Sequence, residues 1–340
     1  MVLYLGNKLS KHGFTPTSVE TLGPRLETLK FRVETRSSFR NEIFRLADML
    51  WAIWKYRQEK PVVLIDTYST NAFWFAYAAA VVSDLLKLNY IPILRGGNLP
   101  ERVDHSPRAV AKLFNKSFRN IAVSGYLHDE FTRRNLKVET IHNFIELKNY
   151  PFKLRDKVRP RILWVRAFHK IYNPGLALEI FKQLKLKHPD ASLCMVGPDK
   201  DGSMESCRQL ADSMGLDVTF TGRLDKKNWT ELSKDYDIFL NTTNYDNAPI
   251  SVMEAMALGM CVVTTNAGGI PYLFEDGKEG MMVNKNNAGE AVRSIETLID
   301  NPVLCASVSH NARTKSETWD WEVIGMHWKQ LIDEAKVIQK

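Results

Sequence analysis

The second half of the chain alternates short apolar runs with longer segments whose apolar residues recur at helical spacing. Apolar runs of this length are typical of strands that are buried on both faces of a parallel sheet. They predict strands at 161–165, 191–196, 217–221, 237–241, 260–264 and 280–283. Helices are predicted between them, at about 174–187, 204–214, 229–234 and 251–258. This alternation favours a doubly wound parallel sheet.

The first half repeats the pattern less regularly. It predicts strands at 2–5, 61–66, 90–94, 120–124 and 137–141, and helices at 41–56, 71–87 and 108–118. A polar and basic stretch, 151–160, has a proline at each end and separates the halves. We therefore expect an α/β protein with two Rossmann-like domains that face a cleft. The expected domains are 1–150 and 151–318, and a last helix within 319–340 is expected to cross back to the first domain.

Length and composition agree with two ordinary globular domains. The chain has 340 residues, of which 44% are hydrophobic and 25% charged, which excludes a largely disordered protein. Its longest apolar run, 72–82, is shorter than the roughly 20 residues that span a bilayer. The first residues lack the pattern of a secretory signal, so we expect a cytoplasmic protein. Reduced, buried thiols without a metal are expected at Cys194, Cys207, Cys261 and Cys305.

Charge is unevenly distributed along the chain. Residues 1–150 contain 22 Lys and Arg against 14 Asp and Glu, whereas residues 151–340 contain 24 against 25. A basic first half suggests an anionic partner, although solubility alone explains it equally well. The predicted helix 41–56 and its end also combine aromatic and basic side chains: Arg45, Trp51, Trp54, Lys55 and Arg57. Such a helix either covers the sheet, which we favour, or contacts an anionic membrane surface peripherally, on its inner face. Nucleic-acid binding is not expected, because no basic and aromatic stacking motif is present.

Two acidic residues follow the predicted strand 237–241. Asp246 lies in the loop, and Glu254 is expected in the first turn of the next helix. Ligands of parallel sheets bind at the carboxyl ends of strands, where helix N–H groups attract phosphate. Carboxylates there can also accept hydrogen bonds from sugar hydroxyls. The alternative is that both acids only favour the helix N-terminus.

Two further short motifs allow a functional and a structural interpretation. Gly268 and Gly269 follow a predicted strand, so they either let backbone approach a ligand or form a simple turn. Asp235 and Asp237 form an Asp-x-Asp pair, a pattern that can hold a divalent cation. They precede a strand, at the edge away from ligand sites, and we therefore expect no metal there.

Residues 246–271 resemble the donor-site signature of the retaining GT-B glycosyltransferases of glycosyltransferase family 4 (group 1). The signature consists of an acidic residue, seven further residues, Glu254, Ala-Met-Ala-x-Gly, an apolar strand and Gly-Gly-Ile-Pro. Four more segments resemble the family in the expected order: Asn143-Phe-Ile-Glu146, Trp164-Val-Arg166 with Lys170, Val196-Gly197 and Phe220-Thr-Gly-Arg223. The resemblance covers residues 140–335 and is only architectural in the first domain.

This resemblance implies the GT-B architecture and transfer of a sugar, with retention, from a nucleoside-diphosphate sugar. The donor would carry UDP or GDP, and the acceptor would be a glycan or a lipid-linked molecule in polysaccharide or glycolipid synthesis. No cofactor or metal is implied. The implied catalytic residues are Arg166, Lys170, Asp246 and Glu254. The implied donor-binding residues are Gly6, Gly222, Arg223, Asn247, Ala248, Pro249, Ile250, Ser251, Gly268 and Gly269. Supporting roles could fall to Arg95, Asn143 and His169. Arg166 and Lys170 would neutralise the diphosphate, and the alternative for them is a surface pair.

The sequence also departs from the family pattern. Asp246 replaces a Glu, and Tyr272 stands where Glu is common. Lys170 is not followed directly by Gly, so His169 or Asn173 could occupy the expected position. Arg95 ends the strand at which the family often has a His. An alternative function is therefore a catalytically degenerate homologue that binds nucleotide sugar as a partner subunit, although the intact donor residues favour an enzyme.

Overall fold

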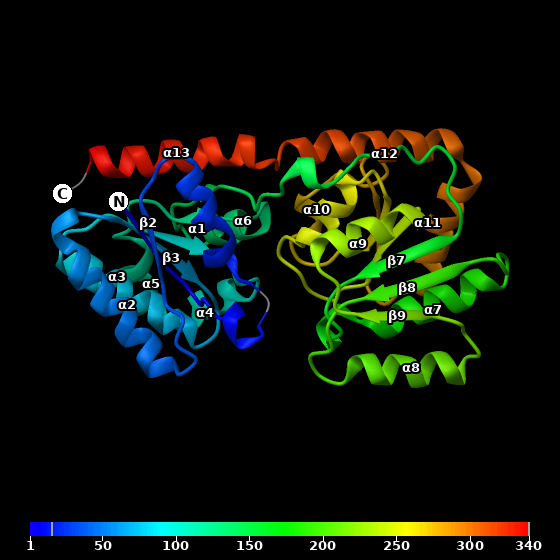
Figure 1. The fold of residues 1–340 in the computed structure, drawn as a ribbon, viewed down its shortest axis with the longest axis horizontal. Helices are drawn as coiled ribbons and strands as arrows, with labels where there is room; N and C mark the ends of the chain where they lie inside the picture. The colour runs from blue at the N-terminus through cyan, green and yellow to red at the C-terminus, as the bar shows by residue number, and fades with distance from the viewer. Residues whose placement is uncertain (15, 339–340) are drawn as a thin grey trace. The chain divides into compact units, whose positions relative to one another are not determined.

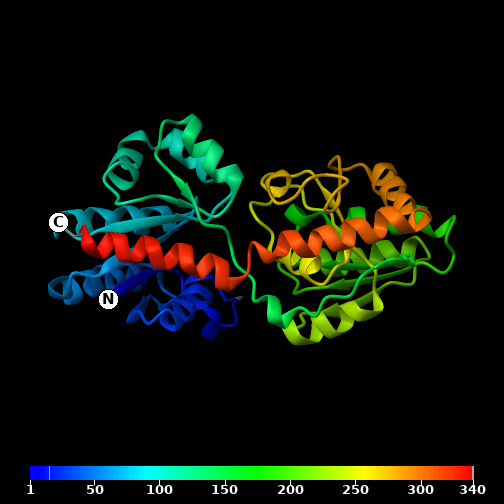
Figure 2. The same ribbon diagram turned by 90° about the horizontal axis from the view of Figure 1, so that it is seen from above.

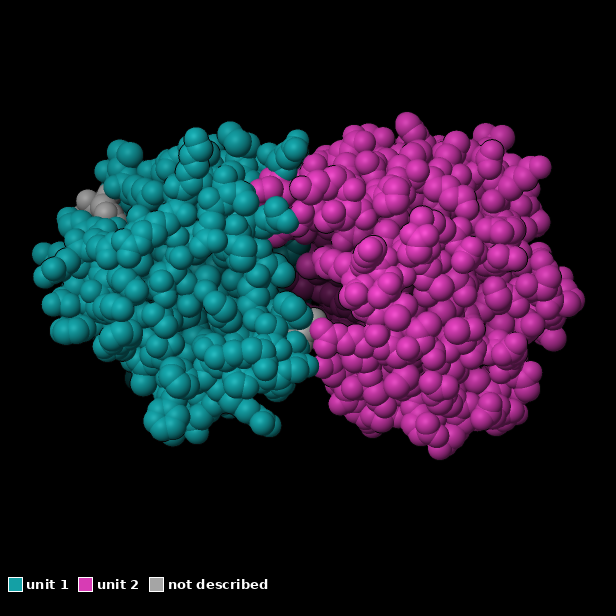
Figure 3. All heavy atoms as spheres, viewed as in Figure 1, with its two compact units in different colours: residues 1–143, 322–340 teal, residues 144–321 magenta. Residues whose placement is uncertain are grey.

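The computed structural model describes residues 1–14 and 16–338, which divide into two compact units. Unit 1 contains residues 1–143 and the C-terminal segment from Glu322, and unit 2 is the continuous segment Phe144–Trp321 (Figure 3). The division thus falls at 143 and 321, whereas the sequence suggested 150 and 318.

Unit 1 is built on a sheet of six parallel strands in the order β2-β1-β3-β4-β5-β6 (Figure 1). The strands are β1 (Val2–Leu5), β2 (Val33–Arg36), β3 (Val62–Thr67), β4 (Tyr90–Leu94), β5 (Ile121–Ala122) and β6 (Glu139–Thr140). The helices are α1 (Ser18–Thr28), α2 (Glu42–Tyr56), α3 (Ala72–Leu85), α4 (Leu99–His105), α5 (Pro107–Phe114), α6 (Gly125–Arg133) and α13 (Trp321–Val337).

The apolar strand residues of unit 1 are buried on both faces of the sheet. Leu3 and Leu5 belong to a core cluster with residues of α2, α3, α5 and α6, and Val2 and Tyr4, of opposite parity, are buried as well. The C-terminal helix α13 is part of unit 1, as expected, and lies along it in Figures 1 and 2. The amide of Asn89 donates to the carbonyl of Ala335 in this helix over 2.7 Å.

Unit 2 has a second sheet of six parallel strands, in the order β12-β11-β10-β7-β8-β9. The strands are β7 (Arg161–Val165), β8 (Ser192–Val196), β9 (Thr219–Gly222), β10 (Ile238–Asn241), β11 (Cys261–Thr265) and β12 (Met281–Val283). The helices are α7 (Pro174–Lys185), α8 (Ser203–Ser213), α9 (Lys226–Leu232), α10 (Ile250–Ala257), α11 (Ala288–Asp300) and α12 (Pro302–Glu317). One face of the sheet packs on α7 and α11, and the other on α10.

The two ends of unit 2 lie side by side. The N–H of Ile145 donates to the carbonyl of Trp319 over 2.9 Å, and the N–H of Trp321 donates to the carbonyl of Ile145 over 2.9 Å. The rings of Phe144 and Trp321 are 4.8 Å apart between centroids. The chain therefore enters and leaves unit 2 at one place.

Within the described residues, every helix falls short of the length and apolarity that a membrane crossing requires. The helices that the sequence did not reveal are α1, α4, α6, α11 and α12. In α1, Gly23 and Pro24 suggest a turn, but a capping box between Thr17 and Glu20 starts the helix, and Leu22 and Leu26 are buried. The strand β2 beside it was missed as well.

Candidate active site

Arg166 follows strand β7 and Asp246 follows strand β10, and the structure brings them together at the carboxyl ends of these neighbouring strands. A guanidinium nitrogen of Arg166 is ion-paired with Oδ2 of Asp246, while Oδ1 accepts the N–H of Asn247 over 2.9 Å. The guanidinium also lies over the ring of Tyr172, 4.3 Å from its centroid. Burial raises the pKa of Asp246, and the charge of Arg166 opposes this shift. Two residues expected in one site are thus paired.

Glycines allow the loops around this pair to approach by backbone alone. A Cβ atom on Gly197 would lie 1.8 Å from the carbonyl oxygen of Arg166. On Gly268 and Gly269 it would lie 2.1 Å and 1.8 Å from the carbonyl oxygens of Asp246 and Asn247. The N–H of Gly269 donates to the carbonyl of Asp246 over 2.8 Å. The two glycines after β11 therefore form more than a simple turn, because they let that loop close on the residues after β10.

The sequence predicted Glu254 in the first turn of its helix, but in the structure this residue lies beyond the first turn. Pro249 precedes α10, so Ile250 is its first residue and Glu254 its fifth. Its side chain is buried, and Oε1 accepts a hydrogen bond from the hydroxyl of Tyr150 over 2.5 Å. The amino group of Lys226 lies 2.8 Å from the same oxygen. Sequence reasoning missed Tyr150 and Lys226, which belong to no motif.

The start of α10 leaves polar groups unused. It has no side-chain cap, so the N–H groups of Ile250 and Ser251 face outward from the helix. The hydroxyl of Ser251 and Oδ1 of Asn244 are buried and have no hydrogen-bond partner among the described residues. Buried polar atoms normally have partners. These two atoms of unit 2 lack partners and belong to residues near Asp246 in the sequence, which is consistent with a site for a polar ligand.

The loop after β7 contributes Lys170 and His169. Lys170 begins a short 3₁₀ helix and is exposed, and its N–H donates to Asp201 over 3.0 Å. His169 caps that helix, and its Nδ1 accepts the N–H of Ile171 over 3.1 Å. The carbonyl of Ile171 accepts the N–H of Asn244 over 2.8 Å, which ties this loop to the one after β10.

The remaining residues of unit 2 that were expected to bind the donor lie at the end of β9 and at the start of α10. Asn247 and Ala248 are buried, Pro249 and Ile250 lead into α10, and Gly222 ends β9. The carbonyl of Gly222 accepts the N–H of Gly197 over 2.8 Å. Arg223, the next residue, is exposed.

Gly6, Arg95 and Asn143 belong to unit 1, where they surround a buried carboxylate. Arg95 donates from Nε to Oδ1 of Asp66 over 3.1 Å and from another nitrogen to Oδ1 of Asn143 over 2.9 Å. The hydroxyl of Tyr4 donates to Oδ1 of Asp66 over 2.9 Å. A Cβ atom on Gly6 would lie 2.8 Å from Oδ2 of Asp66. Burial raises the pKa of Asp66, while the charge of Arg95 opposes this shift. Arg95 is thus engaged in a buried ion pair within its own unit.

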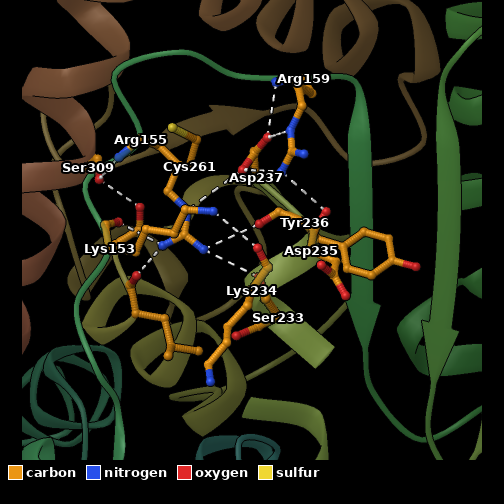
Figure 4. A network of polar contacts seen from close by, with 12 residues as sticks. Lys153, Arg155, Arg159, Ser233, Lys234, Asp235, Tyr236, Asp237, Cys261 and Ser309 are labelled. Carbon is orange, nitrogen blue, oxygen red and sulfur yellow. Dashed lines mark hydrogen bonds and ion pairs between the residues drawn. The ribbon is translucent and has the colours of Figure 1, made fainter. Parts of the chain in front are cut away.

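Asp237 of the Asp-x-Asp pair takes part in a structural ion-pair network, and Asp235 contributes its backbone carbonyl, which accepts from Arg159 over 3.5 Å (Figure 4). Oδ2 of Asp237 accepts from Nε of Arg159 over 2.7 Å, and Nε of Arg155 lies 3.9 Å from Oδ1. Arg155 also donates to the carbonyls of Lys153, over 2.7 Å, and of Leu258. The network fixes the segment before β7 to the amino end of β10. No cluster of metal-binding side chains is found among residues 1–14 and 16–338.

All four cysteines are free and buried, as the sequence suggested. Cys261 in β11 and Cys305 in α12 lie close together, with 3.3 Å between their sulfur atoms.

Arg45, which we had grouped with the basic residues of the α2 surface, is buried instead. It donates to the carbonyls of Phe39 and Arg40, over 2.9 and 2.8 Å, and therefore shapes the start of α2.

Solved structures share the fold over nearly the whole chain. Anabaena HepE, solved in complex with UDP, superposes with a TM-score of 0.77 over 98% of this chain and 99% of that protein, at 18% identity. Sucrose-phosphate synthase from Thermosynechococcus elongatus superposes with a TM-score of 0.78 over 99% of both chains, at 13% identity. The expected α/β fold of the GT-B class is confirmed.

Curated relatives match at the sequence level over part of their length. An uncharacterized glycosyltransferase of Haemophilus influenzae is 28% identical over 207 residues, which cover 60% of this chain and 57% of the relative. The sulfoquinovosyl transferase SQD2 of Arabidopsis thaliana is 27% identical over 148 residues, 43% of this chain and 28% of that protein. The chain thus spans between about a quarter and three fifths of these relatives.

Residues 148–315 match the family of glycosyl transferases group 1. This segment contains all the strands of unit 2 and the residues Arg166, Asp246 and Glu254. This match confirms, for unit 2, the resemblance seen in the sequence.

Proposed function

We propose that the protein transfers a sugar from a nucleoside-diphosphate sugar, with retention, to a glycan or a lipid-linked acceptor. UDP is the preferred carrier in this proposal, because HepE was solved with UDP and with UDP-glucose. The acceptor would belong to polysaccharide or glycolipid synthesis. Unit 2 would bind the donor.

The observation that carries the proposal is the arrangement of charge around the start of α10. The guanidinium of Arg166, the exposed amino group of Lys170 and the uncapped N–H groups of α10 come from loops that are joined by backbone hydrogen bonds. A nucleoside diphosphate gains negative charge as its bond to the sugar breaks. Hydrogen-bond donors and cations of the protein that are already in place stabilise that charge without reorganisation. Asp246 and Glu254 would bind hydroxyl groups of the donor.

In this proposal no metal ion is required, since two cationic side chains and a helix N-terminus meet the charge of the diphosphate. Asp235 and Asp237 take no part, because Asp237 is already held by Arg159 and Arg155.

Peripheral contact with an anionic membrane, at the inner face of a cytoplasmic membrane, is a second part of the proposal, and it rests on α2. Ile43 and Phe44 are 77% and 63% exposed, and Trp54 is 55% exposed. Lys55 lies 4.8 Å from the ring centroid of Trp51, and Arg57 lies 4.2 Å from that of Trp54. Exposed aromatic side chains with adjacent cations are typical of helices that lie in the membrane interface. A lipid-linked acceptor would be reached there.

The decisive experiment combines binding with turnover. UDP-, GDP-, ADP- and dTDP-sugars are tested for their effect on the melting temperature, which a ligand of the folded state raises. Each sugar that binds is then incubated with the protein and with membrane lipid extract, and release of nucleoside diphosphate is measured. We expect a UDP-sugar to bind and to be consumed. Binding without release, with every extract, would favour the degenerate partner subunit, and no binding would contradict the proposal.

A further inference from the structure

Tyr150 lies in the segment that leads from unit 1 to the first strand of unit 2. It follows a short 3₁₀ helix, Leu147–Asn149, and its side chain is buried, with 2% of the residue exposed. Its hydroxyl donates to Oε1 of Glu254 over 2.5 Å, across 104 positions of sequence. A buried carboxylate thus receives its shortest contact from a residue outside the motif.

The position of this hydroxyl is fixed by its surroundings. One guanidinium nitrogen of Arg313 donates to the carbonyls of Tyr150 and of Ala257, over 2.9 and 2.8 Å. Ala257 is the last residue of α10, the helix that contains Glu254. The ring of Tyr150 is 6.5 Å from that of Trp229 between centroids. Arg313 therefore ties the backbone of Tyr150 to the end of α10, and Trp229 contacts the ring of Tyr150.

Burial and the charge of Glu254 raise the pKa of Tyr150. The phenol accordingly remains protonated and acts as a donor over the whole neutral range. Such a donor orients one oxygen of the carboxylate. The described residues provide no donor to the other oxygen, Oε2.

Lys226 contacts the same oxygen but in a different way. Its amino group lies 2.8 Å from Oε1, and its side chain is 71% exposed. Exposed ion pairs contribute little, because water and side-chain entropy compete with them. Tyr150 is therefore the partner that restricts Glu254, and Lys226 is one that a ligand could displace.

We propose that Tyr150 is a positioning residue for the donor nucleoside. Its hydroxyl holds Glu254 so that Oε2, and Oε1 after displacement of Lys226, receive the two neighbouring hydroxyls of the ribose. The inference rests on the proposed function, since it deepens the account of the same donor site. It predicts that Tyr150 contributes to the preference for a ribonucleotide over a 2′-deoxynucleotide.

The test compares Tyr150→Phe, which removes only the hydroxyl, with wild type, using UDP and 2′-deoxy-UDP as probes. We expect the Kd of UDP and the KM of the UDP-sugar to rise about tenfold, with kcat within about twofold, as for loss of binding alone. The preference for UDP over 2′-deoxy-UDP should shrink. In a Glu254→Gln background the same change should add less than about twofold, because the partner charge is gone.

Two control variants separate positioning from general damage. Lys234→Ala removes an exposed lysine that pairs with Glu231 and should change the Kd of UDP by less than about twofold. Tyr90→Phe removes a buried hydroxyl in unit 1, which donates to the carbonyl of Lys112, and should leave UDP binding unchanged. Melting temperatures of all variants report their folding.

The outcomes distinguish the inference from the proposed function. Equal UDP binding by wild type and Tyr150→Phe would overturn the inference but not the proposed function. The same would follow if Tyr150→Phe weakened UDP binding as much in the Glu254→Gln background as in wild type. Failure of wild type to bind UDP or any other nucleoside diphosphate would overturn the proposed function, and the inference with it.

Discussion

Arg166 and Asp246, 80 positions apart in sequence, are ion-paired at the carboxyl ends of β7 and β10. The pair holds the guanidinium in one orientation, over the ring of Tyr172, before any ligand arrives. A pre-oriented cation loses less conformational entropy when it binds a diphosphate. In our proposal Asp246 would therefore have a second role besides the binding of sugar hydroxyls, because it orients the guanidinium that would meet the phosphates.

The ionisation of Asp246 should be visible in the pH dependence of transfer. Burial raises its pKa, so the carboxyl is protonated at a higher pH than an ordinary Asp, whose pKa is about 3.9. As pH falls towards the raised pKa, the ion pair with Arg166 is lost and kcat/KM should decrease. The contribution of Asp246 to folding has the opposite sign: it is complete below the pKa of the unfolded chain and is lost as pH rises through the folded value.

The measurement is kcat/KM between pH 4 and 8 for wild type and Asp246→Asn, with melting temperatures at each pH. The variant should lack the acid limb, whatever its residual rate. An acid limb that is identical in both proteins would assign it to another group.

Replacement of Glu254 by Gln should weaken the donor site. The charge that accepts ribose hydroxyls is removed, so we expect at least about a tenfold loss in kcat/KM, or about 1.4 kcal/mol. Steady-state kinetics with the UDP-sugar, on protein with an unchanged circular-dichroism spectrum, measure it. Kinetics like those of wild type would remove Glu254 from the site.

Chelation should leave the transfer rate unchanged. The charge of the diphosphate is met by Arg166, Lys170 and the N-terminus of α10 in our proposal, and none of these needs a cation. Activity is compared before and after dialysis against EDTA, and after addition of Mn²⁺ or Mg²⁺. Loss with EDTA and recovery with Mn²⁺ would contradict the metal-free proposal.

A methyl group on Gly269 should separate the two loops of the donor site. The backbone of Gly269 is compatible with alanine, with φ at −88°, so the clash of its Cβ with the carbonyl of Asn247 is the whole cost. Overpacking of this kind costs about 1–3 kcal/mol, and donor binding should weaken together with stability. Melting curves and UDP binding are compared with those of Gly175→Ala, where the nearest atom to a Cβ is 3.9 Å away. Equal stability of both variants would contradict the close approach.

The exposed face of α2 should bind anionic vesicles. Each adjacent Lys or Arg contributes about 1 kcal/mol of attraction, which salt screens over about 10 Å at 0.1 M. Sedimentation with anionic and neutral liposomes is compared for wild type, for Lys55→Glu with Arg57→Glu, and for Trp54→Ala. Both changes should reduce binding while UDP binding stays unchanged.

A charge-matched control for the vesicle experiment is Lys182→Glu with Lys185→Glu on α7 of unit 2. If anionic liposomes bring down no more wild-type protein than neutral ones do, the membrane contact is wrong and a dissolved acceptor remains.

The strands of unit 2 could be predicted because the central ones are buried on both faces and are continuous apolar runs. The prediction of 161–165 matches β7, and 237–241 includes β10. Helix α1 could not be predicted in the same way, since its capping box and buried face compete with a Gly-Pro pair that usually signals a turn. At α1 the local sequence pattern gives a wrong prediction, because tertiary packing of the buried face determines the helix.

In the candidate site, the sequence revealed the residues that a motif keeps close together but not their partners. The contact of Tyr150 with Glu254 depends on how the linker folds over α10, and no spacing encodes it. The position of Glu254 also depended on one residue, because Pro249 starts the helix earlier than expected. Arg45 was misplaced for a related reason: its charge suggested the surface, but carbonyl groups of the preceding loop bind it.

The ends of unit 2 are adjacent, because Ile145 is hydrogen-bonded to Trp319 and Trp321, and the unit is one continuous segment between the two parts of unit 1. If unit 2 binds the donor as we propose, recombination at these two points would exchange the donor specificity and leave the sheet of unit 1 and its C-terminal helix intact. Chimaeras with junctions at 144 and 321 are therefore a direct route to new donor–acceptor combinations, and the same property would let evolution vary the two specificities separately.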